Sequence, residues 1–173
     1  MTGNRIAASA LAAGLLLAGC SSTTPPTVDG RPGSAGVGSS TGRAADASSA
    51  FAVIAAAVPT AKVGSVITAA TDANHLLGRP GQYTSKVTFT DRRVLAADAQ
   101  GFKPGDVELG GAMEVFAAHG DAETRAAYIQ AVTKSIPVLA EYDYVHGTTV
   151  VRVSHFLTPA QAKEYDAAAV NLG

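Results

Sequence analysis

The pattern of apolar and polar positions divides the 173 residues into three stretches, and the first is an apolar leader. An apolar run covers residues 6–17, and Arg5 is the only charged residue before residue 20. A membrane-spanning helix needs about 20 apolar residues, so this run is too short to be one. Its length and the small residues at its end are typical of a signal peptide. We therefore predict that residues 1–19 are a signal peptide that is removed on export.

Cys20 follows this leader, and it is the only cysteine in the chain. It ends the sequence Leu17-Ala18-Gly19-Cys20, which has the form of a bacterial lipobox. Small residues let a peptidase approach the backbone, and the thiol supplies the sulfur that takes up diacylglycerol. Stable anchoring needs at least two acyl chains, and a diacylglyceryl-cysteine with palmitate-like chains supplies them. We expect a lipoprotein anchored through Cys20 on the extracytoplasmic face of the cell membrane.

The second stretch, residues 20–49, is polar and small throughout. Ser, Thr, Gly, Pro and Ala dominate it, and Val28 and Val37 are its only larger apolar side chains. Such a segment cannot bury enough surface to offset the entropy of ordering. We therefore predict a disordered tether at residues 20–49, followed by one folded domain at residues 50–173.

The third stretch carries the alternations of a folded domain. Val87 and Phe89 alternate with Lys86 and Thr88, and this period of two is typical of a strand with one buried side and one side facing solvent. Periodicity of both kinds predicts helices at residues 61–71, 121–136 and from Pro159, and strands at 85–91, 112–117, 141–145 and 148–154.

The helix ends have sequence signals of different strength. Val63, Val66, Ile67 and Ala70 form the stripe of the helix predicted at 61–71. In the second helix, Asp121 is the expected N-cap, Ala122, Ala126, Ile129, Val132 and Ile136 are the expected buried stripe, and Pro137 is the expected stop. The third helix has the clearest start, a capping box with Thr158 as the cap, Pro159 at the first helical position and Gln161 three residues after the cap.

Strands with one solvent-exposed side favour an antiparallel sheet whose other face is covered by helices. We therefore predict an α+β domain of two layers, with a mainly antiparallel sheet of about four strands packed against two or three helices. The residues after the tether are numerous enough for one domain with a modest core.

Charge and composition exclude several kinds of partner. The formal net charge is −1 and no run of Lys or Arg occurs, so nucleic acid is not an expected partner. The single cysteine excludes metal sites built on thiolates, and no two histidines have the spacing of a zinc-binding helix. We predict neither a metal nor a cofactor. His146 precedes Gly147 in an expected hairpin, where we assign it a role in the turn.

The segment from Asp72 to Tyr83 is the most unusual part of the domain. Asn74, His75, Arg79 and Tyr83 are candidate ligand-binding residues, because they combine hydrogen-bonding side chains with the Gly and Pro of a shaped loop. The alternative, which we favour, is an ordered helix-to-strand connection in which Arg79 pairs with a carboxylate. The two interpretations predict opposite effects of replacing Arg79.

These features together resemble a known group of proteins. The lipobox, the Ser/Thr/Pro/Gly tether, the sequence NHLLGRPGQY at residues 74–83 and the sequence AEYDYVHG at residues 140–147 are similar to those of small lipoproteins of high-GC Gram-positive bacteria. The similarity covers roughly residues 71–168. It implies an envelope location and a lipid anchor, and it assigns no catalytic residue.

Two classes of function stay open. A surface-tethered binding or protein-interaction module, whose partner is an envelope protein or a small ligand, fits a tether that presents a small domain without a catalytic constellation. The alternative is a small envelope enzyme that uses His75 or His155 with a nearby carboxylate. We favour the binding module and expect that the protein is not an enzyme.

Overall fold

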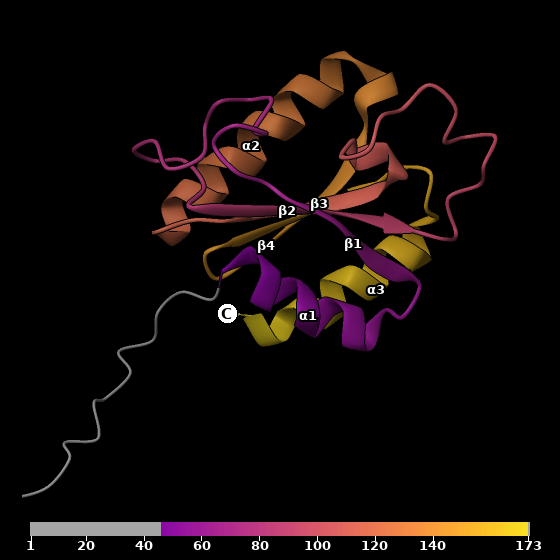
Figure 1. Ribbon diagram of the computed structural model, residues 1–173, viewed down its shortest axis with the longest axis horizontal. Coiled ribbons are helices and arrows are strands. Elements are labelled where there is room, and N and C mark those ends of the chain that lie inside the picture. Colours follow the sequence, from indigo (N-terminus) through magenta and orange to yellow (C-terminus); the bar gives the residue numbers. More distant parts are fainter. Residues whose placement is uncertain (1–45, 173) are drawn as a thin grey trace, which may run out of the picture. The chain divides into compact units, whose positions relative to one another are not determined.

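The computed structural model describes residues 46–172, so the predicted signal peptide, Cys20 and nearly all of the tether lie outside the described residues. The described chain forms one sheet with helices on both of its faces (Figure 1). Its helices are α1 (Ala47–Ala57), α2 (His119–Ser135) and α3 (Pro159–Ala169), and its strands are β1 (Ala61–Val66), β2 (Ser85–Asp91), β3 (Gly110–Val115), β4 (Glu141–His146) and β5 (Thr149–Ser154).

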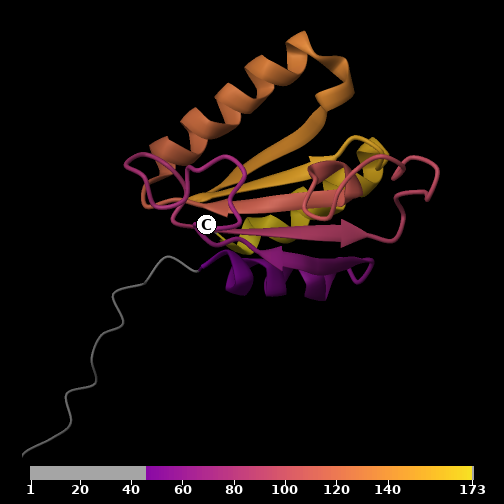
Figure 2. The ribbon, with the colours of Figure 1, turned by 45° about the horizontal axis from the view of Figure 1, so that its top comes forward.

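The sheet confirms the predicted α+β fold. Its five strands lie in the order β1-β2-β3-β5-β4, and every neighbouring pair is antiparallel. The sheet therefore has one strand more than the four predicted by sequence periodicity. The helices also differ in placement from a two-layer arrangement, because α1 and α3 cover one face while α2 lies over the other (Figure 2).

The helix predicted at residues 61–71 is wrong, because this segment begins with strand β1. Val63 and Val66 pair with β2, and the register shifts at Gly64, which lies in a bulge. The bulge breaks the period of two, so the apolar residues of an edge strand imitate helical spacing. Val63 and Val66 are 56% and 60% exposed, so the apparent stripe is not a buried face.

The first helix is instead α1, which begins before the predicted domain boundary at residue 50. Asp46 is its N-cap and accepts a hydrogen bond from the backbone N–H of Ser49 at 2.8 Å. Phe51 and Ile54 are buried against the sheet. The sequence of α1 is rich in Ala and has almost no polar face, so it lacks the contrast from which an amphipathic helix is predicted.

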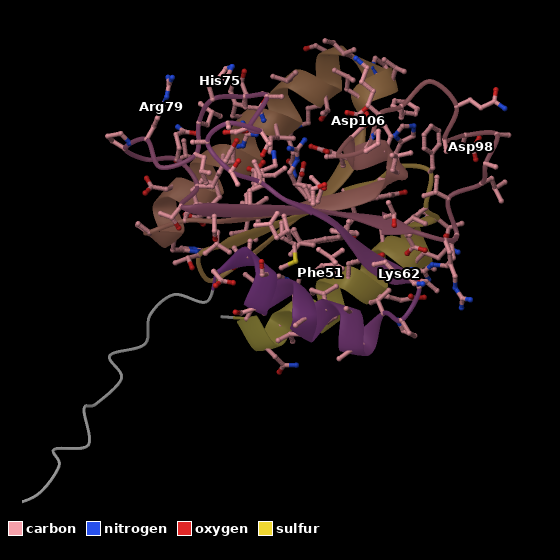
Figure 3. All side chains as sticks on the ribbon, viewed as in Figure 1. Phe51, Lys62, His75, Arg79, Asp98 and Asp106 are labelled. Carbon is pink, nitrogen blue, oxygen red and sulfur yellow. The ribbon has the colours of Figure 1, made fainter. Side chains whose placement is uncertain are left out.

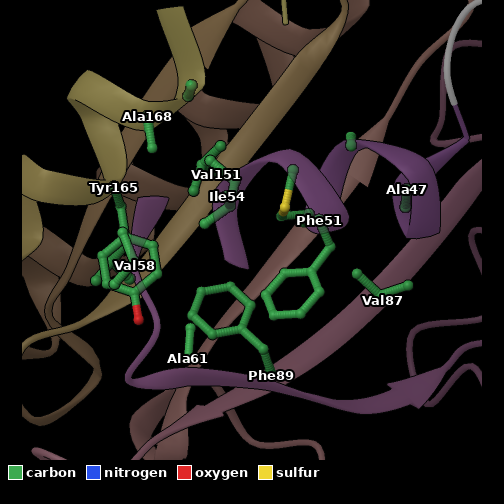
Figure 4. Close-up of a cluster of buried hydrophobic side chains, with 14 of the residues drawn as sticks. Ala47, Phe51, Ile54, Val58, Ala61, Val87, Phe89, Val151, Tyr165 and Ala168 are labelled. Atoms are coloured by element: carbon green, nitrogen blue, oxygen red, sulfur yellow. The ribbon is translucent and has the colours of Figure 1, made fainter. Parts of the chain in front are cut away.

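The apolar face of the sheet, covered by α1 and α3, holds the main core (Figure 4). The Phe89 ring stacks between Phe51 and Tyr165, with centroid distances of 5.3 and 5.2 Å. The Tyr165 hydroxyl donates to the buried carboxylate of Asp91 at 2.6 Å. Alternate residues of β2, β3 and β5 point into this core, as the period of two predicts.

The two later helices confirm most of the predicted signals. The capping box of α3 is present, with hydrogen bonds in both directions between Thr158 and Gln161. The predicted cap of α2 is wrong, because Ala118 occupies that position and Asp121 lies in the first turn. The predicted stripe of α2 is buried only as far as Ile129, and Ile136 is 43% exposed. The C-terminal half of α2 rises away from the sheet (Figure 2).

Candidate functional site

The face of the sheet under α2 is charged. The side chains that point away from the apolar core include a lysine, an arginine and three acids on neighbouring strands, and α2 adds a second arginine from above. These residues are Lys86 of β2, Glu114 of β3, Glu141 and Asp143 of β4, Arg152 of β5 and Arg125 of α2.

Glu114 is the centre of this charged face. Its side chain is 0% exposed, and three cationic side chains surround it. Lys86 Nζ lies 3.1 Å from Glu114 Oε1, Arg125 Nε donates to Oε2 at 2.8 Å, and Arg152 Nη1 donates to Oε1 at 3.2 Å. Burial raises the pKa of Glu114, but the charges of Lys86, Arg125 and Arg152 outweigh it and hold the pKa at about 2. Glu114 is therefore a buried carboxylate that stays ionised.

Arg152 links this centre to a second pair of acids. Its guanidinium donates to both oxygens of Glu141 at 2.9 and 3.0 Å. Asp143 lies opposite Arg152 in the register, yet neither of its buried carboxylate oxygens has a hydrogen-bond partner within residues 46–172. Burial and the neighbouring charge of Glu141 raise the pKa of Asp143 to about 7. This acid can change its protonation state near neutral pH.

A cavity of about 400 Å³ lies between this charged face and α2. We call it the α2 cavity. Its volume is within the range of roughly 300–1,000 Å³ that is common for small-molecule sites. Lys86, Thr88, Arg152 and Glu141 form its floor, and Ile129 and Val132 belong to the wall that α2 provides. Its rim is formed by Ile67, residues 71–74, residues 104–108 and Leu139.

The α2 cavity continues along the helix into a second hollow. Asn74, Arg125 and Tyr128 line both spaces, and Leu76, Gly81 and Gln82 line only the second. Tyr128 is 61% exposed, and its ring lies 5.9 Å from the guanidinium carbon of Arg125. An aromatic ring beside a cation at the mouth of a cavity offers a surface for the apolar part of a ligand.

The candidates from the segment at residues 74–83 are placed very differently from one another. Asn74 lines the cavity, and the Tyr83 hydroxyl is buried and donates to both oxygens of Asp72 at 2.7 and 2.8 Å. His75 and Arg79 are exposed and point outward (Figure 3). Within residues 46–172, Arg79 forms no ion pair, so the buried pair that we favoured for it is not present.

Asp72 explains why this loop is ordered without Arg79. Its carboxylate accepts hydrogen bonds from the backbone N–H groups of Leu76 and Leu77 at 2.8 and 2.9 Å. Burial raises the pKa of Asp72, but these bonds and the Tyr83 hydroxyl outweigh it and lower the pKa to about 2. One satisfied aspartate thus fixes the loop that forms a rim of the cavity.

The histidines have contacts that the sequence did not indicate. The His155 ring packs on Phe156 at 4.2 Å between centroids, and its buried Nδ1 has no hydrogen-bond partner in the described part of the chain. His146 ends β4 and its Nε2 lies 2.7 Å from Asp166 of α3, while Gly147 takes the positive φ of 54° that the hairpin turn needs. The turn role that we assigned to His146 therefore belongs to Gly147.

Sequence reasoning missed the charged floor. Lys86 was interpreted as a side chain facing solvent, and Glu114, Arg125 and Arg152 received no role. A signal was present, because each strand of the pattern carries a charged residue at a position that alternates with buried ones. The sequence pattern alone predicts that these residues face solvent, and it is the position of α2 over them that makes this face of the sheet a buried one.

Within residues 46–172, no group of three or more His, Cys, Asp or Glu side chains is placed to hold a metal ion, and no helix is long and apolar enough to cross a membrane. Comparisons with protein-family models, curated proteins and solved structures find no match.

Proposed function

We propose that this chain is a membrane-anchored, surface-exposed binding module of the cell envelope, and that the α2 cavity holds its small ligand. The observation that carries the proposal is the set of cations around the cavity. The side chains of Lys86, Arg125 and Arg152 are only 9%, 11% and 15% exposed. Desolvated charges are costly unless they are paired and hydrogen-bonded, and Lys86 and Arg125 share the single carboxylate of Glu114, which leaves N–H donors facing the cavity.

The arrangement favours binding over catalysis. Within residues 46–172, every charged side chain of the charged face except Asp143 forms an ion pair with another of opposite sign. Among the described residues, His75 and His155 neither line the cavity nor lie within ion-pair distance of a carboxylate. The alternative of a small envelope enzyme using these histidines therefore has no observation in its favour.

The membrane part of the proposal rests on the lipobox and is tested at Cys20. In cells supplied with labelled palmitate, Cys20→Ala is expected to abolish incorporation and to release the protein or leave its precursor uncleaved. Ser21→Ala is the matched control and should be labelled as the unchanged chain is. Labelling that persists in Cys20→Ala would contradict the anchor.

The binding part is tested by filling the cavity. Val132 lines the α2 cavity, and Val132→Phe places a larger apolar side chain there. Val53→Phe makes the same change on α1, where Val53 is 40% exposed on the other side of the sheet. In a ligand-observed NMR screen of small polar fragments with the full chain in detergent, fragments should bind the unchanged chain and Val53→Phe but not Val132→Phe. A screen in which Val132→Phe keeps every bound fragment would refute a ligand site in this cavity.

A further inference from the structure

The charges around the α2 cavity are sorted along its length. The sheet register places Lys86 opposite Glu114 and pairs Glu114 with Val150. Four residues further along β5, Ser154 pairs with Glu141. Four residues of strand span roughly 14 Å, so the end of the cavity at Lys86 and the end at Glu141 are well separated.

The end of the cavity near Lys86 holds two cations, Lys86 and Arg125, together with the carboxylate of Asp72. The oxygens of Asp72 already accept hydrogen bonds from the Tyr83 hydroxyl and the backbone N–H groups of the loop, so they pair with neither cation. Lys86 and Arg125 share Glu114, which is fully buried and does not line the cavity, whereas both cations do. Among the described residues, the only carboxylate that Lys86 contacts is Glu114, and Arg125 Nη1 donates to no protein acceptor. The cavity therefore meets two cations with spare N–H donors, and a carboxylate is a natural acceptor for them.

The other end of the cavity is acidic. Asp106 and Glu108 line it from the loop before β3, and Glu141 lines it from β4. Arg152 is the cation that pairs with Glu141, and it is also shared with Glu114. Within residues 46–172, the Glu108 side chain forms no ion pair or hydrogen bond. Three carboxylates therefore lie at this end, and the guanidinium of Arg152 is the cation that they have beside them. Such an excess of negative charge favours a cationic group.

The wall between the two ends is apolar. On α2, Arg125, Ile129 and Val132 follow one another at helical spacing along the side that faces the cavity, and Ile67 and Leu139 add apolar surface at the rim. A ligand that fills the cavity therefore meets a cationic end, an apolar middle and an acidic end in that order.

From this order we propose that the α2 cavity binds a short zwitterionic peptide, with its terminal carboxylate at Lys86 and Arg125 and its terminal ammonium at Asp106 and Glu108. A peptide of three residues spans at most about 11 Å, whereas the two ends of the cavity are roughly 14 Å apart. The protein side chains that extend from both ends make up the difference. This inference rests on the proposed binding function and specifies its ligand class.

The probe is the tripeptide Ala-Leu-Ala, compared with its N-acetylated form and its C-terminal amide. Each blocked peptide keeps the apolar middle and loses one terminal charge. In calorimetric titrations of the full chain in detergent at low salt, the free peptide should bind at least about tenfold more tightly than either blocked form. A blocked peptide that binds within about threefold of the free one would overturn the assignment of that terminus.

Variants locate each terminus. Glu108→Gln should weaken binding of the free peptide by about tenfold and make its affinity equal to that of the acetylated form. Lys86→Met should make the affinity of the free peptide equal to that of the amide. Glu164→Gln on α3 and Lys62→Met on β1 are the matched controls and should leave all three affinities unchanged. Because Lys86 contacts buried Glu114, the melting temperature of Lys86→Met is measured as well, and Glu108→Gln tests the proposal without disturbing that contact.

The outcome also separates this inference from the proposed function. Equal binding of all three peptides that is lost in Val132→Phe would overturn the zwitterion and keep the cavity as a binding site. Absence of binding by all three peptides would overturn the zwitterion alone, because the fragment screen tests the cavity independently.

Discussion

The two faces of the sheet are built from the same strands and have opposite character. In β2, Val87 and Phe89 point into the core under α1 and α3, while Lys86 and Thr88, which alternate with them, line the α2 cavity. One face is closed by stacked aromatic rings, and the other is hollow and held by ion pairs. The difference indicates that stability and recognition are divided between the faces, since packed apolar surface stabilises a fold more surely than a buried ion-pair network does.

The largest effect is expected from breaking the apolar face. Phe89→Ala removes the central ring of the stack between Phe51 and Tyr165, and burial changes of this kind cost about 3–5 kcal/mol. Urea denaturation should show this loss, while Val63→Ala on the exposed edge strand should change the free energy of unfolding by less than about 0.5 kcal/mol. A loss below about 1 kcal/mol for Phe89→Ala would show that this face does not dominate stability.

Breaking the charged face should also destabilise the protein, but through charge. Glu114→Gln keeps the shape of the side chain and leaves three cations without their common carboxylate, at a cost of about 3 kcal/mol. Urea denaturation of the variant and the unchanged chain at about pH 7 gives this difference.

The pH dependence identifies its origin. The pKa of Glu114 is about 2 in the folded protein, below its ordinary value of 4.5, so its stabilising effect is complete above about pH 4.5 and is lost as the pH falls toward 2. The destabilisation caused by Glu114→Gln should therefore shrink across this range. A difference that stays constant with pH would show that lost packing, and not charge, is responsible.

Asp143→Asn should have a smaller effect of the opposite sign. Because the pKa of Asp143 is raised from 3.8 to about 7, the unchanged chain loses stability as the pH rises through this interval. The variant avoids placing an unpartnered carboxylate under α2, so at about pH 8 it should be more stable by roughly 1–3 kcal/mol. Thermal melts at about pH 5 and pH 8 test this, and an advantage that does not grow with pH would contradict it.

The smallest effect is expected at Arg79. Arg79 is exposed and forms no ion pair among the described residues, so Arg79→Ala should change the free energy of unfolding by less than about 0.5 kcal/mol. This reverses the expectation from sequence, in which a buried pair would cost about 3–5 kcal/mol. If the melting temperature of Arg79→Ala fell by several degrees, Arg79 would have the structural role predicted from the sequence.

The sequence predicted those helices and strands whose structure is determined by residues close together in the chain. The alternation of Lys86, Val87, Thr88 and Phe89 predicts β2, and the capping box at Thr158 predicts α3. Both depend on neighbours only a few residues away. The helix predicted at 61–71 was wrong because a bulge at Gly64 is set by pairing with β2, which the local sequence does not show.

The candidate site depends on contacts between distant parts of the chain. Glu114 meets Lys86 from β2, Arg125 from α2 and Arg152 from β5, and no short motif connects these positions. Sequence reasoning therefore chose a dense local segment at residues 74–83, of which Asn74 lines the α2 cavity and His75 and Arg79 point away from it. The site draws on β2, β3, β4, β5 and α2, so it could be predicted only from the order of the strands and the position of α2.

The central claim is that one face of the sheet stabilises the fold and the other binds the ligand. Mapping where the ligand binds tests this claim most directly. In amide NMR spectra of the full chain in detergent, titration with Ala-Leu-Ala should shift the resonances of Lys86, Glu108, Arg125 and Arg152 and leave those of Phe51 and Tyr165 in place. Val132→Phe should remove these shifts. Shifts that gather on α1 and α3, or that persist in Val132→Phe, would contradict the assignment of recognition to the charged face.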